Sequence, residues 1–159
     1  MKHWLSFCLA LTAATSLPVF FVHAQTNLPE ACSVISPAEV TTILGRKDFG
    51  KPRPEKGPGP GESSCGFPGR VQSGVTISLS PTVRANFEEF RKLLVEQGEK
   101  PEAVSGVGDA AYFWHPGRVY LLTERTMITV SLSNETAVSE KMKQDLLALA
   151  RAVMSKLKG

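Results

Sequence analysis

Two cysteines, Cys32 and Cys65, constrain the fold of this chain more than any other feature of its sequence. They lie 33 positions apart, one ahead of a predicted helix and the other at the start of a predicted strand. In an oxidising compartment such a pair forms a disulfide, and two free thiols or a metal pair are the alternatives. A metal site needs more ligands than His115 and scattered carboxylates supply. We therefore expect a bridge whose closed loop contributes roughly 3.5–4 kcal/mol to stability.

The oxidising compartment is itself a prediction, and it comes from residues 1–24. A short positive start precedes 19 uncharged residues, and Val22-His23-Ala24 places small residues ahead of a cut before Gln25, as signal peptidase requires. A retained membrane anchor is the alternative, because 19 residues just span a bilayer. Cys8 lies within this leader and lacks the small residues of a lipobox ahead of it. We expect an exported protein, periplasmic or extracellular, with no membrane span after cleavage.

Composition is that of an ordinary globular chain. With 159 residues, of which 42% are hydrophobic and 21% charged, the chain can form one core after the leader is removed. The formal net charge of +3 comes without a basic stripe, which argues against a dedicated nucleic-acid binder. The expected organisation is a flexible lead-in over 25–31, followed by a single domain over 32–159.

Three helices are predicted from their caps and from apolar residues at helical spacing. Ser36-Pro37-Ala38-Glu39 combines a capping box with proline in the first turn, and Gly45 is suited to end that helix. An amphipathic helix follows over 83–98, and a third helix begins near Ala137.

Five strands are predicted, at 65–67, 75–79, 110–114, 119–123 and 127–133, with Glu124-Arg125 as a tight turn. Serine and threonine alternate with apolar residues in 75–79 and 127–133, which indicates a sheet face open to water. The element order α-β-β-α-β-β-β-α joins strand pairs by short turns and predicts a mainly antiparallel sheet. The expected fold is an α+β two-layer sandwich with about five strands and helices on one face.

Residues 46–63 are expected to form a long loop, because prolines and glycines interrupt any helix or strand there. Arg53 is one of five basic residues in this segment. A solvated surface loop is one interpretation, and a contact surface for an acidic partner is the other.

Four motifs follow one another along the chain: 31–40 (ACSVISPAEV), Leu44-Gly45, Cys65 and 104–114 (VSGVGDAAYFW). In this order they resemble small exported bacterial proteins of unknown function, many of which are lipoproteins. This chain lacks the lipobox cysteine common in that family and has Phe67 where the family often has tryptophan. The resemblance implies an exported α+β domain and brings no catalytic residues with it.

No catalytic arrangement is predicted from the sequence. His115 directly precedes Pro116-Gly117 in a predicted turn, and abundant serines make any match to a Ser/His/Asp site unspecific. Gly106 and Gly108 match a dinucleotide fingerprint in letters, but they precede a strand where that fingerprint needs a helix, so we interpret them as turn residues. We expect no enzyme activity, no cofactor and no metal.

The aromatic segment 110–114 holds the best candidates for binding. Tyr112 and Trp114 share one strand face, opposite Phe113, which is expected in the core. Together with Tyr120 and Arg53 they are predicted to contact a protein or a small-molecule ligand, and packing under a loop or the terminal helix is the alternative. The main hypothesis is a non-catalytic binding or interaction protein of the bacterial envelope. An inhibitor or immunity-type protein against an exported enzyme is the second, and a small hydrolase centred on His115 is the third.

Overall fold

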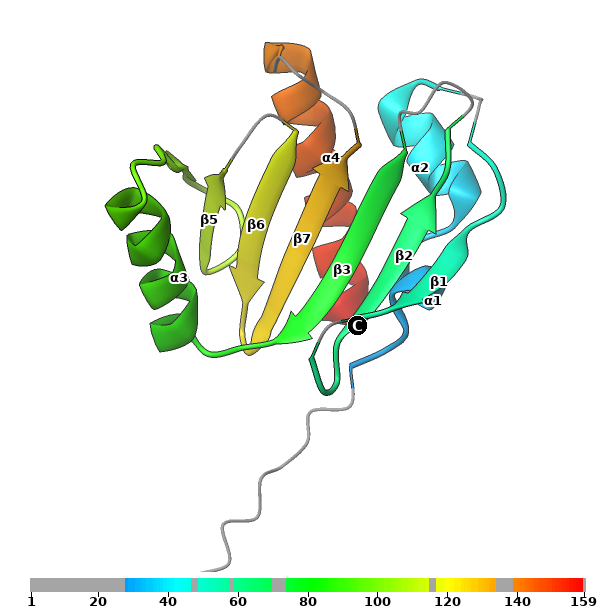
Figure 1. Ribbon diagram of the computed structural model, residues 1–159. Coiled ribbons are helices and arrows are strands. Elements are labelled where there is room, and N and C mark those ends of the chain that lie inside the picture. Colours follow the sequence, from blue (N-terminus) through cyan, green and yellow to red (C-terminus); the bar gives the residue numbers. More distant parts are fainter. Residues whose placement is uncertain are drawn as a thin grey trace, which may run out of the picture.

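The computed structural model describes residues 28–46, 49–57, 59–69, 74–114, 117–133 and 139–158, and they form an α+β fold around an open sheet (Figure 1). The helices are α1 (Ala31–Val34), α2 (Pro37–Leu44), α3 (Arg84–Glu96) and α4 (Glu140–Leu157). The strands are β1 (Arg53–Lys56), β2 (Ser63–Phe67), β3 (Val75–Pro81), β4 (Glu102–Val104), β5 (Ala110–Phe113), β6 (Arg118–Thr123) and β7 (Thr126–Leu132). The predicted signal peptide and His115 lie outside the described residues.

The sheet is antiparallel at every strand pair, in the order β1-β2-β3-β7-β6-β5-β4. This confirms the predicted α+β class and the antiparallel pairing. The predicted tight turn is also confirmed, because Glu124-Arg125 joins β6 to β7 with Thr123 opposite Thr126. Glu124 takes a positive φ of 53° in this turn.

The predicted strand count of about five is wrong, because the described residues contain seven strands. β1 lies within 46–63, where no strand was expected, and β4 is the other addition. Both are edge strands, and all four residues of β1 are exposed, so β1 has no apolar alternation for a sequence pattern to detect. Proline is tolerated on an edge strand, which explains why Pro54 does not prevent pairing with β2.

Helices cover both faces of the sheet, which corrects the prediction that all helices pack on one face. The larger core joins α1, α2 and α4 to the first face through residues such as Ile77, Val130 and Leu146. A second core lies on the opposite face, where Phe87 and Leu94 of α3 are buried. In Figure 1, α4 lies behind the sheet, whereas α3 lies to one side, next to β5.

The first predicted helix, α2, begins and ends as its sequence indicates. The Glu39 N–H donates to Ser36 Oγ at 3.3 Å, and the Ser36 N–H donates to the Glu39 carboxylate at 2.9 Å, which completes the capping box. Gly45 ends the helix in the left-handed region at φ 64°. The Glu39 carboxylate also lies 2.7 Å from Nζ of Lys156, so this cap ties α2 to α4.

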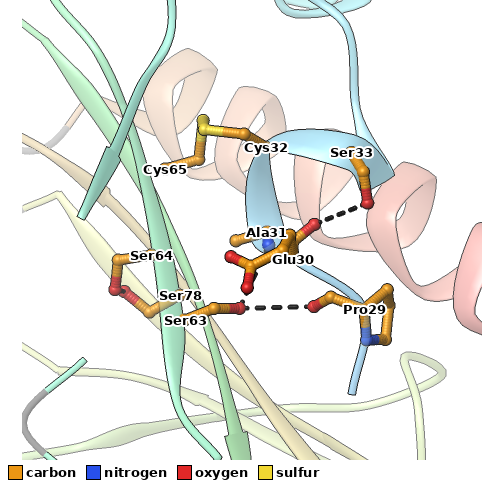
Figure 2. The surroundings of a disulfide bond; sticks show 9 residues. All are labelled: Pro29, Glu30, Ala31, Cys32, Ser33, Ser63, Ser64, Cys65 and Ser78. Atoms are coloured by element: carbon orange, nitrogen blue, oxygen red, sulfur yellow. Dashed lines mark hydrogen bonds between the residues drawn. A yellow bond between two sulfur atoms is a disulfide. The ribbon is translucent and has the colours of Figure 1, made fainter. Parts of the chain in front are cut away.

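The predicted disulfide between Cys32 and Cys65 is present and joins α1 to β2 (Figure 2). The four-residue helix α1 was not expected from the sequence. Ser63, next to the bridge, explains how it is held: its Oγ accepts from the Ala31 N–H at 3.0 Å and donates to the Pro29 carbonyl at 3.3 Å. The covalent bond and these two hydrogen bonds therefore hold the start of the described chain against β2, the strand next to one edge of the sheet.

Within the part of the chain that the structure describes, none of the helices combines the length and the apolar character that crossing a membrane would need.

Candidate functional site

The face of the sheet opposite α4 is only partly covered, and its open part forms a groove of about 690 Å³. Side chains of α3 cover this face above β5 and β6. The strands β2, β3 and β7 carry no helix on this side, and their outward side chains line the groove. We call this cavity the groove below.

The floor of the groove is made of hydroxyl groups in two rows that cross the sheet. In the first row Ser64, Ser78 and Thr129 are direct neighbours on β2, β3 and β7. In the second row Thr76 lies opposite Ser131. All five side chains are half-buried and line the groove. Figure 2 shows Ser64 and Ser78 on the side of the strands away from α1 and the disulfide.

The continuation of each row explains what bounds the groove. The first row continues to Glu55 on β1 and, at its other end, to Tyr120 on β6. The second row passes through Gly66, which has no side chain, to Arg53 at one end, and reaches Arg118 at the other. Strand alternation thus gives the groove a hydroxyl floor with charged residues at its edges and an aromatic residue beside α3.

An aromatic cluster forms the wall on the α3 side. Phe90 lies 5.6 Å from the Tyr120 ring and 6.1 Å from the Trp114 ring, between centroids. Tyr120 stacks on Tyr112 at 5.3 Å. Both Phe90 and Tyr120 line the groove, so this wall exposes aromatic carbon next to the polar floor.

The structure brings three of the predicted binding residues, Tyr112, Trp114 and Tyr120, into one aromatic cluster and leaves Arg53 apart from them. Tyr112 lies on the face opposite Phe113, as predicted, but it is only 1% exposed and packs against Phe87 at 5.1 Å, so it is not the exposed anchor that was considered. Trp114 is half-buried under α3, and neither side chain lines the groove. The alternative, packing under a loop or the terminal helix, is not what the structure shows either, because the helix that covers both side chains is α3. Neither Tyr112 nor Trp114 is therefore placed to contact a ligand in the groove.

The other two predicted residues lie at the groove or next to it. Tyr120 lines the groove although it is 6% exposed. Arg53 lies outside it, in a neighbouring hollow of about 160 Å³ that shares Glu55 and Thr76 with the groove. The floor hydroxyls were missed as a binding surface. Their signal was the serine and threonine alternation in β3 and β7, which indicated a wet face but not that this part of it would stay uncovered.

Tyr120, at the end of the groove floor, is the lining residue whose pKa is shifted by its surroundings. Burial raises the pKa of Tyr120 above its ordinary value of 10.0, although a hydrogen bond from Arg118 opposes that rise. The guanidinium of Arg118 donates to the Tyr120 hydroxyl at 3.4 Å and lies over the Trp114 ring at 5.6 Å. Tyr120 is therefore a neutral phenol at physiological pH, able to donate and accept a hydrogen bond at the end of the floor.

Two serines of the groove floor are hydrogen-bonded to each other. Ser64 Oγ donates to Ser78 Oγ at 2.7 Å, so its hydrogen-bond partner is a second hydroxyl and not a base. The described residues lining the groove include no histidine and no cysteine. Across the described segments, histidine, cysteine and carboxylate side chains form no group of three that would hold a metal ion.

Gly106 and Gly108, the glycines of the apparent fingerprint, lie in the turn before β5 and have positive φ values of 71° and 61°. Next to them, the Asp109 N–H donates to the Leu122 carbonyl at 2.8 Å, and the Asp109 carboxylate accepts from the Glu124 N–H. This segment holds the β6–β7 hairpin in place. These contacts agree with the interpretation as turn residues.

Comparison with protein-family models, with curated proteins and with solved structures found no match to this chain.

Proposed function

We propose that this chain is an exported, non-catalytic binding protein of the bacterial envelope, and that the groove is its ligand site. The proposal combines the leader sequence over 1–24 with the disulfide, which is compatible with an oxidising compartment. The resemblance to small exported bacterial proteins supports the same location.

One observation carries the assignment to the groove: part of one sheet face is uncovered and forms a cavity lined by convergent polar groups beside an aromatic wall. A cavity of several hundred Å³ with a few placed polar groups is the usual form of a small-ligand site. Helices α1, α2 and α4 pack on the other face and α3 covers part of this one, so the groove is a large uncovered feature among the described residues.

A binding role without catalysis agrees with the chemistry of the lining. Ser64 and Ser78 are paired with each other, so neither has a base that would activate it. Turnover would need such a base, or a pair of carboxylates facing each other across the ligand. The two carboxylates that line the groove, Glu55 and Glu62, both come from the β1–β2 hairpin at one edge of it, and Glu62 accepts from the Gly59 N–H at 3.0 Å. A ligand that enters the groove is therefore expected to leave unchanged.

The test is to map binding of the soluble fraction of a bacterial envelope extract onto the ¹⁵N-labelled mature protein by NMR. Amide shifts are expected at Ser78, Thr129 and Phe90. The variant Thr76→Val/Thr129→Val removes two floor hydroxyls at nearly constant volume and should reduce these shifts, whereas Thr42→Val on the exposed side of α2 should not. Shifts confined to α2 and α4, no shifts at all, or chemical conversion of the bound compound would each contradict the proposal.

A further inference from the structure

We infer that the groove takes a neutral oligosaccharide, an assignment that rests on the proposed binding function and names its ligand class. The observation behind it is the pairing of a two-dimensional array of hydroxyls with an exposed aromatic side chain and balanced charge.

The spacing of the floor suits a ligand that presents many hydroxyl groups. Ser64, Ser78 and Thr129 lie on three neighbouring strands, which are about 4.8 Å apart, and the row of Thr76 and Ser131 lies two residues further along the strands, about 7 Å away. A hydroxyl donates one hydrogen bond and accepts two, so each floor position is able to accept from a sugar hydroxyl, although Ser64 already donates its proton to Ser78. A regular array of this kind matches a chain of repeated polar rings better than it matches a compact ligand.

The wall supplies the apolar half of such a site. Sugar rings have one face of C–H groups, and that face packs against aromatic carbon. Phe90 is half-buried, lines the groove and lies at its α3 side, where it is supported by Tyr120 and Trp114. A ring resting on Phe90 would place its hydroxyls toward Thr129, which is the direct neighbour of Tyr120 in the first row.

Charge argues for a neutral ligand. The charged residues that line the groove are Glu55, Glu62, Lys56 and Arg118, so acidic and basic groups are equal in number. The Glu62 carboxylate is already engaged by the Gly59 N–H at 3.0 Å, and Arg118 is engaged by Tyr120. A polyanion or polycation would meet no net field of opposite sign here.

The polar floor argues against a protein helix as the occupant. An amphipathic helix docks through an apolar stripe and would bury the five floor hydroxyls, of which Ser64 and Ser78 have only each other as partners, which is unfavourable. A peptide strand would need a free sheet edge, and the edges here are the short strand β4 and the proline-containing strand β1.

The experiment is isothermal titration of the mature protein with chitotetraose, cellotetraose and maltotetraose, and with tetragalacturonic acid as an acidic counterpart. At least one neutral tetrasaccharide should bind. Thr76→Val/Thr129→Val should weaken that binding at least about tenfold, because two neutral hydrogen bonds are lost. Phe90→Ala should weaken the binding of that tetrasaccharide more than the double valine variant does, and Thr42→Val should leave this binding unchanged.

The inference is overturned if no neutral tetrasaccharide binds, if the double valine variant binds as tightly as the wild type, or if the acidic sugar binds more tightly and loses affinity with salt. Because the double valine variant keeps side-chain volume on the floor, its result holds even where Phe90→Ala reduces folding. Protease treatment of the envelope extract separates the two proposals. If NMR shifts at the groove disappear after that treatment, the ligand is a protein and only the oligosaccharide assignment fails.

Discussion

Gly108→Ala is expected to be among the most damaging single-methyl substitutions in this chain, and Gly106→Ala is its matched control. Both glycines have a left-handed backbone, at φ 61° and 71°. A Cβ on Gly106 would meet nothing within 4 Å. A Cβ on Gly108 would overlap the backbone carbonyl oxygen of Leu122 and lie 3.1 Å from the Leu121 side chain.

The two substitutions share one penalty and differ in the other. A left-handed backbone costs an alanine roughly 1–2 kcal/mol, which is the whole expected effect at Gly106. At Gly108 the new methyl group must displace backbone, because a carbonyl oxygen cannot rotate away as a side chain does. That shift breaks the bond from the Asp109 N–H to Leu122 and strains the packing, so the total loss is expected to be about 3 kcal/mol or more.

Urea unfolding measures the difference, with the fluorescence of Trp114 as the probe. The free energy of unfolding should fall in the order wild type, Gly106→Ala, Gly108→Ala, with a gap of about 2 kcal/mol between the variants. Gly98→Ala, at φ 86° and also in open space, should behave like Gly106→Ala. Equal losses at Gly106 and Gly108 would refute the claim that close approach of β6, and not φ alone, requires the glycine.

Three further predictions concern stability. Replacing both Cys32 and Cys65 by alanine should lower the unfolding free energy by roughly 3.7 kcal/mol, since the bridge closes a 33-residue loop, and reduced wild type should match it in urea; a loss below about 1 kcal/mol would contradict this. Hydrogen bonds from Lys156 and Ser36 hold the pKa of Glu39 at about 2, against 4.5 in the unfolded chain. This carboxylate therefore stabilises the fold above pH 4.5, that contribution is lost as pH falls toward 2, and Glu39→Gln should flatten acid unfolding there. Tyr112→Phe should leave stability unchanged or raise it by about 1 kcal/mol, because the buried hydroxyl has no hydrogen-bond partner among the described residues, and thermal melts that show a clear loss would oppose this.

Local signals predicted the local structure well. The capping box at Ser36, the left-handed Gly45 and the two-residue turn at Glu124 each depend on residues within one turn of the chain, so the sequence contains everything that decides them. The disulfide was also predictable, because only Cys32 and Cys65 follow the predicted leader and two cysteines allow one pairing.

The candidate site was less predictable, although its ingredients were visible. Alternation in β3 and β7 indicated that serine and threonine share a wet face, but a periodic pattern does not say which part of that face a helix will cover. Tyr112 and Trp114 were predicted as binding residues because aromatic side chains on a sheet face are either anchors or core. Their burial depends on α3, which packs against them from the side of the sheet opposite α4.

By itself, then, the sequence determined the period of the elements that have an apolar pattern, their caps and turns, and the pairing of Cys32 with Cys65, because these depend on neighbouring residues or on a count. Only the tertiary structure decided that β1 and β4 join the sheet, that α3 crosses to the second face, and that a hydroxyl floor remains open beside it. The physical reason is that edge pairing and helix placement arise from contacts between segments far apart in the chain, where many arrangements satisfy the same local pattern and packing selects one.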